Sequence, residues 1–156
     1  MCLAVYIASE FELPTEEWSM EKWSEDKLNR PYVFFEPLSK ENELVTRNLS
    51  LPYIYHVGTN TGCSCGFIYS EWYLQDVEFS EEERKNIRIA RGHYKLLHDM
   101  LSNLKRQDRV KYEIFVYWEG AQIDDTKTVQ KISISLDDLV DEKFYFKEMH
   151  LYEVNT

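Results

Sequence analysis

The sequence is poor in the residues that usually form loops and linkers. It contains only 5 Gly and 4 Pro in 156 residues, and it has no low-complexity run. Linkers between domains are typically rich in Gly, Pro or Ser, so this scarcity predicts one continuous domain over residues 1–156. Disorder of the whole chain is excluded as well, because aromatic residues make up 15% of the sequence and disordered chains contain few of them.

Long apolar runs and basic clusters are also missing. No segment approaches the roughly 20 apolar residues that cross a bilayer, and the first residues lack the basic region of a signal peptide. With 18 Lys and Arg against 28 Asp and Glu, the net charge is −10, which disfavours nucleic acid and anionic membranes as partners. We therefore expect a cytoplasmic monomer or homodimer whose partner is a small molecule or another protein.

Hydrophobic patterning predicts an α+β domain with a mainly antiparallel or mixed sheet packed by one long helix. Residues 2–8 carry apolar or small side chains on both faces, which indicates a central strand. A short helix is expected from Thr15, and a helix or loop at 41–49. Strands before and after the long helix, with hairpin-like spacing near the C-terminus, favour this fold class. The further strands are expected at residues 31–35, 52–57, 66–69, 112–118, 129–136, 144–149 and 151–154.

The clearest element is a long amphipathic helix over about residues 81–105. Ser80 and Glu83 form a capping-box pattern, and Glu81–Glu83 place negative charge at the positive end of the helix dipole. His93 is expected at the edge of the apolar stripe, partly buried. With fewer than four heptads, the stripe predicts packing on a sheet rather than a coiled coil. Its residues recur at spacings of three and four, at Ile87, Ala90, Tyr94, Leu97, Leu101 and Leu104.

Chemistry is expected in the segment from Gly58 to Gly66. It holds three of the five glycines and two of the three cysteines, and His56 lies just before it. Hairpin loops usually have two to five residues, so this connection is long for a purely structural turn. An odd number of cysteines without an export signal predicts free thiols rather than a disulfide framework.

The first interpretation is a reactive thiol site formed by Cys63 and Cys65. Two cysteines separated by one residue form only a small, strained disulfide ring, which is readily reduced. Backbone N–H groups in a glycine-rich loop can also stabilise a thiolate. Cys63 and Cys65 are therefore candidate catalytic thiols that should lie close together and be accessible. Whether the protein is an enzyme stays open.

The second interpretation is a metal site. Cys63 and Cys65 would be adjacent ligands, with His56 and Cys2 completing a tetrahedral set for zinc. The single residue between the two cysteines is a shorter spacing than structural zinc sites usually have. This ligand set closes only if the first strand lies beside the loop. The competing interpretation is a tight turn with unliganded thiols.

Cys2 has a third interpretation of its own. Met1-Cys2 resembles the opening of glutamine amidotransferases and related N-terminal nucleophile hydrolases. The resemblance implies that Cys2 would be the catalytic nucleophile once Met1 is removed, with its α-amine as the base. The alternation of Cys2 with Ala4 and Tyr6 favours instead a small residue on a buried strand, whose thiol is shielded and reacts slowly.

Aromatic residues among acidic neighbours support a non-enzymatic alternative. Trp18, Trp23, Trp72 and Tyr73 lie in segments of weak periodicity with many carboxylates. Aromatic side chains surrounded by charge are typical of protein-binding surfaces, and the negative net charge favours basic partners. The sequence therefore leaves a protein–protein interaction module or a homodimer open beside the thiol and metal sites.

Overall fold

The structure, a computed structural model, describes residues 2–19, 29–38, 43–69, 71–75, 77–104, 109–119 and 128–156. Its strands are β1 (Cys2–Ser9), β2 (Val33–Pro37), β3 (Tyr53–Thr59), β4 (Lys111–Glu119), β5 (Gln130–Ser135) and β6 (His150–Asn155). Its α-helices are α2 (Glu43–Asn48) and α3 (Glu81–Leu104), and its 3-10 helices are η2 (Ser64–Phe67), η3 (Glu71–Leu74) and η4 (Leu136–Val140).

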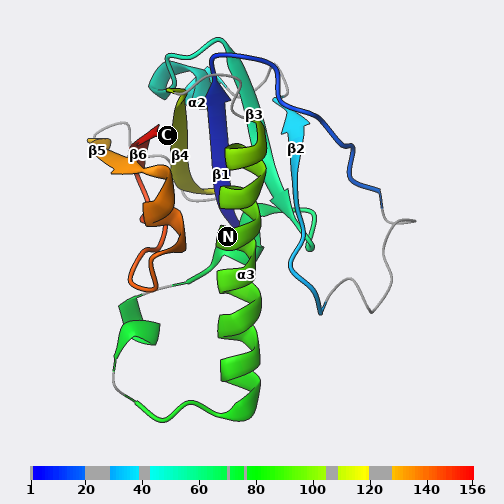
Figure 1. The fold of residues 1–156 in the computed structure, drawn as a ribbon, viewed down its shortest axis with the longest axis vertical. Coiled ribbons are helices and arrows are strands. Elements are labelled where there is room, and N and C mark those ends of the chain that lie inside the picture. The colour runs from blue at the N-terminus through cyan, green and yellow to red at the C-terminus, as the bar shows by residue number, and fades with distance from the viewer. Residues whose placement is uncertain are drawn as a thin grey trace.

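The strands form one six-stranded sheet in the order β2-β3-β1-β4-β6-β5 (Figure 1). Neighbouring strands are antiparallel except β5 and β6, which run parallel. A mixed sheet with one long helix confirms the predicted α+β fold. The hairpin-like arrangement expected at the C-terminal end is wrong. After β5, η4 and residues 141–149 return the chain to the end of the sheet at which β5 begins, so β6 runs parallel to β5.

The central strand β1 is paired differently on its two sides. Along β4 it pairs over its whole length, from Cys2 opposite Glu119 to Ser9 opposite Tyr112. Along β3 it pairs only over its second half, which begins with Tyr6 opposite His56. Beyond His56, β3 continues beside β2 alone. The first half of β1 therefore has one side that no strand of the described residues occupies.

Two hydrophobic clusters cover the two faces of the sheet. α3 lies across one face (Figure 1) and packs on the larger cluster, to which β1 contributes Leu3, Val5 and Ile7. The smaller cluster lies on the opposite face, where Val45 of α2 packs with side chains of β1, β4 and β6. β1 contributes to both clusters, which is the two-sided burial that its alternating sequence predicts.

The observed helix α3 agrees closely with the helix predicted from the sequence. The Ser80 hydroxyl accepts a hydrogen bond from the Glu83 N–H at 3.2 Å, and the Glu83 carboxylate accepts one from the Ser80 N–H at 2.8 Å, which completes the capping box. The middle of the apolar stripe is buried and its two ends, Ile87 and Leu104, are partly buried. His93 differs from the prediction, since it is fully buried.

Two expected strands are wrong. Residues 66–69 form no strand, because the chain enters η2 instead and makes no hairpin with β3. Residues 144–149 form no strand either. Phe146 directs its backbone N–H to the Tyr94 hydroxyl at 3.0 Å, and its ring packs on Tyr94, so this segment pairs with α3 rather than with the sheet.

The short helix expected from Thr15 is also wrong within the described residues up to 19. The Glu16 N–H donates to the Phe35 carbonyl at 2.9 Å, so the chain runs beside β2 and does not coil on itself. The segment 41–49 forms α2 from Glu43 onward. In the described ranges no helix combines the length and the apolar character that a membrane crossing requires.

Truncation of the buried stripe of α3 should destabilise the protein. Leu97→Ala or Leu101→Ala removes a fully buried branched side chain, which should lower the free energy of unfolding by about 2–5 kcal/mol. Lys95 is exposed on the same helix and forms an ion pair with Asp99, so Lys95→Ala should change the free energy of unfolding by about 0.5 kcal/mol or less. Urea unfolding followed by circular dichroism measures both, and equal losses on the two faces would contradict the packing of α3.

Candidate functional site

The unpaired side of β1 is occupied by side chains of η2. The Val5 N–H donates to the Ser64 hydroxyl at 2.8 Å, and the Leu3 backbone N–H donates to the Cys65 sulfur. Backbone N–H groups inside a protein need partners, and here two side chains supply what a neighbouring strand would otherwise supply. These contacts dock the 58–66 loop onto the start of β1.

Hydrogen bonds within the loop fix its shape. The Cys63 carbonyl accepts from the N–H of Thr59 at 2.9 Å and from its hydroxyl at 2.6 Å. The same hydroxyl accepts from the Gly66 N–H at 3.0 Å. Gly62 has a φ of 77°, in the left-handed region that glycine adopts without strain. The loop is therefore an ordered turn that leads directly into η2.

Gly66 allows η2 to pack closely on α3. A Cβ atom at this position would lie 2.7 Å from Cε1 of His93 and 2.7 Å from Oγ1 of Thr59, closer than carbon atoms pack. His93 is fully buried, and within the described part of the chain its ring nitrogens make no hydrogen bond of ordinary geometry. Burial lowers the pKa of His93 to about 4, so a neutral imidazole packs against the loop.

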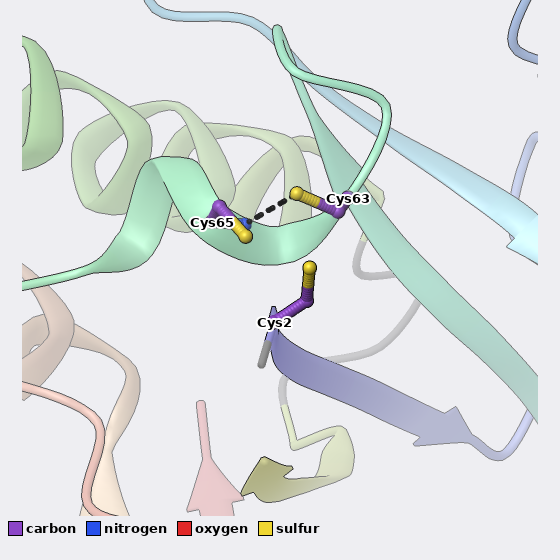
Figure 2. A group of neighbouring side chains, drawn as sticks. All are labelled: Cys2, Cys63 and Cys65. Carbon is purple, nitrogen blue, oxygen red and sulfur yellow. Dashed lines mark hydrogen bonds between the residues drawn. The ribbon is translucent and has the colours of Figure 1, made fainter. Parts of the chain in front are cut away.

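This docking gathers three thiols from two segments of the chain. The sulfurs of Cys2, Cys63 and Cys65 all lie within 4.8 Å of one another. Figure 2 shows them pointing toward a common point, Cys2 from the start of β1 and the other two from the loop and η2. Cys2 is exposed, whereas Cys63 and Cys65 are partly buried. We call these three residues the thiol cluster.

The prediction that the Cys2 thiol is shielded on a buried strand is wrong. Cys2 is exposed, because the apolar cluster on its side of the sheet reaches Ala4 but does not extend to the end of the strand. Its neighbours across the unpaired side of β1 are the two loop thiols. The condition for the metal interpretation, that the first strand lies beside the loop, is met.

The structure does not bring His56 into the thiol cluster. Its Nε2 lies 3.1 Å from the Ser64 hydroxyl and its Nδ1 lies 3.4 Å from a Glu36 carboxylate oxygen. The Ser64 hydroxyl donates to the Val57 carbonyl at 2.6 Å and is fully buried, so this Glu–His–Ser arrangement offers no accessible nucleophile. Sequence reasoning missed Ser64, since a lone serine between two cysteines carries no signal of burial.

Hydrogen bonds distinguish the two loop thiols. Burial raises the pKa of Cys63, but hydrogen bonds from the Cys65 thiol, the Thr61 hydroxyl at 3.2 Å and the Cys65 N–H at 3.3 Å outweigh it and bring the pKa below its usual value. Burial and the neighbouring Cys63 raise the pKa of Cys65 to about 12. Of the two loop thiols, Cys63 is therefore the one that loses its proton more readily, and Cys65 is the one that keeps it.

Three thiols at this spacing can react with electrophiles and oxidants or bind a soft metal ion. Tetrahedral zinc with Zn–S bonds of about 2.3 Å places its sulfurs about 3.8 Å apart. Sulfurs that already lie within 4.8 Å of one another need only a small contraction to reach that spacing. Among the residues that the structure describes, the thiol cluster is the group whose donors converge in this way.

Exposed apolar side chains gather elsewhere, around η3. Ile68, Trp72 and Val77 are 45%, 46% and 45% exposed, and η3 projects with the first turns of α3 beyond the sheet (Figure 1). Tyr73 is partly buried against the core. Trp18 is 39% exposed and packs near Gly62. Trp23, also predicted for this surface, lies outside the described residues.

The two loop thiols should differ in their reactivity with iodoacetamide. The lowered pKa of Cys63 increases the share of its thiolate form at a given pH, so its alkylation rate should reach half its maximum below the pH typical of free cysteine. Cys65, with a pKa of about 12, should stay protonated and slow. Peptide mass spectrometry across a pH series measures both rates. Thr61→Val should shift the Cys63 profile to higher pH, and faster alkylation of Cys65 than of Cys63 at pH 7 would contradict this assignment.

No family model matches this chain, and no curated protein or solved structure matches it either. The thiol cluster and the hydrogen bonds that hold it are the chemical groups that bear on function.

Proposed function

We propose that the protein binds a soft metal ion, with zinc as the leading candidate, through the thiolates of Cys2, Cys63 and Cys65. The observation that carries this proposal is the convergence of three sulfurs, from segments far apart in the sequence, within 4.8 Å. Thiolates are preferred ligands of zinc and of monovalent copper. The net charge of −10 also favours cations over anions near the protein.

The loop supports binding because hydrogen bonds within the protein hold the segment that carries two of the ligands. The Cys63 carbonyl accepts two hydrogen bonds from Thr59. The hydroxyl of Ser64, which lies between the two ligands, is hydrogen-bonded to the Val5 N–H and to the Val57 carbonyl. Groups that orient the ligands in this way raise metal affinity, because less freedom is lost on binding. In this proposal His56 is a supporting residue that contacts Ser64, and it is not a ligand.

Metal binding would displace protons from the thiol cluster. The hydrogen-bond donors around Cys63 already favour its thiolate. Cys65 must lose a proton, and burial together with the neighbouring Cys63 makes that proton harder to remove because both raise its pKa. Zinc binding should therefore release protons, and the affinity should fall as the pH is lowered because protons compete for the same sulfurs.

The exposed surface around η3 supports a second candidate function, a contact surface for another protein. Glu71, Glu78 and Glu81 are exposed beside the apolar side chains of that surface. Apolar side chains with a charged rim are typical of protein interfaces. A molecular mass that rises with protein concentration would favour this candidate. It does not compete with the metal site, since the two lie on different segments.

Zinc titration tests the main proposal. Reduced, metal-free protein should bind one equivalent of Zn²⁺ in competition with a chromophoric chelator, with one thiolate ligand from each cysteine of the thiol cluster. Cys2→Ser, Cys63→Ser and Cys65→Ser should each weaken binding by about tenfold or more, because each replaces a thiolate with a poor zinc ligand.

Ser133→Ala, an exposed position on the edge strand β5, is the matched control and should bind zinc like the unmodified protein. Circular dichroism of each variant shows whether the fold is kept. Zinc affinity that is unchanged in all three cysteine variants, or no stoichiometric binding by the unmodified protein, would contradict the proposal.

A further inference from the structure

We infer that this metal site has a fourth coordination position open to an external thiolate, so that the protein exchanges its metal with a small thiol carrier. The inference rests on the proposed function and adds to it the class of the exchanging ligand. It is argued from the number of donors, from the exposure of the thiol cluster and from the way in which its three members are held.

The donor count leaves one position of a tetrahedral ion to be filled. The thiol cluster offers three sulfurs, and no carboxylate or imidazole of the described residues joins them within the same distance. His56 is held by Ser64 and Glu36, and His93 is buried against Gly66. Zinc in proteins takes four ligands, and sites that act on other molecules keep one position for them.

The position of the thiol cluster also argues against a purely structural metal. Structural zinc sites are closed sites that hold a fold together. Here the loop is docked by hydrogen bonds of the protein itself, through Ser64 on Val5 and Cys65 on Leu3. The sheet has an apolar cluster on each face. Cys2 is exposed, which leaves that side of the metal accessible from solvent.

The three ligands differ in how firmly they are held, which predicts the order of exchange. The Cys63 sulfur is hydrogen-bonded to the Thr61 hydroxyl and to the Cys65 N–H, and the Cys65 sulfur accepts a hydrogen bond from the Leu3 N–H. Cys2 stands exposed at the end of β1. An incoming thiolate would form its bond to zinc at the open position and displace the water molecule held there. A second thiol would then bond to zinc through its sulfur as the Cys2–zinc bond breaks, and its proton would pass to the Cys2 sulfur. Zinc remains divalent throughout.

Cobalt substitution tests the open position directly. The reduced protein is loaded with one equivalent of Co²⁺, and the sulfur-to-cobalt charge-transfer absorption is followed as 2-mercaptoethanol is added. A fourth thiolate beside three should raise this absorption per cobalt by about one third, with saturation at one thiol per protein. Ultrafiltration confirms that the cobalt stays on the protein. Ethylene glycol, which has the same size but no thiol, is the matched control and should leave the spectrum unchanged.

The outcomes separate the inference from the proposed function. If Co²⁺ binds with three thiolates and the spectrum does not respond to 2-mercaptoethanol, the open position is refuted and the metal site stands. If Co²⁺ and Zn²⁺ do not bind, both are refuted. In support of the inference, 2-mercaptoethanol should also speed zinc transfer to a chelator by about tenfold or more, whereas equal transfer rates with 2-mercaptoethanol and with ethylene glycol would overturn it.

Discussion

The thiol cluster depends on two backbone N–H groups of β1 that face none of the described strands. β3 pairs with β1 only as far as Tyr6 and then continues beside β2, which leaves Leu3 and Val5 without a strand partner on that side. Burying such groups unpaired costs about 1–3 kcal/mol each, so side chains of the following loop take the place of the strand. The Ser64 hydroxyl accepts a hydrogen bond from the Val5 N–H, and the Cys65 sulfur accepts one from the Leu3 N–H. Because both acceptors sit beside Cys63, this backbone requirement also brings Cys63 to Cys2.

The same arrangement gives each thiol a different environment. Cys63 receives hydrogen bonds that favour its thiolate, Cys65 keeps its proton, and Cys2 is exposed at the end of the central strand. A metal ion would replace the proton between Cys63 and Cys65 and draw in Cys2 as the third ligand. Thiol reactivity and the proposed metal binding would therefore both follow from one hydrogen-bonded geometry.

Local patterns in the sequence predict most of the fold. The capping box at Ser80 and the stripe through Leu97 and Leu101 locate α3, because both signals arise within a few turns of one helix. Two-sided burial of β1 follows from its composition in the same way. Alternation tells which residues share a face, but it carries no information on which strand lies beside which. The parallel pairing of β5 with β6, the turn of the chain into η2 and the exposure of Cys2 all depend on such long-range neighbours, as does the burial of Ser64.

The glycines and cysteines of the loop mark the candidate site in the sequence, and the sequence also offers Cys2 as a ligand. That Cys2 lies beside the loop, and His56 does not join it, depends on the sheet register. The central claim is that Cys2, Cys63 and Cys65 bind one metal ion together. X-ray absorption at the zinc edge of the zinc-loaded, reduced protein measures this most directly. The account predicts three sulfur neighbours at about 2.3 Å and one lighter neighbour at about 2.0 Å. A first shell with one sulfur or none would contradict it.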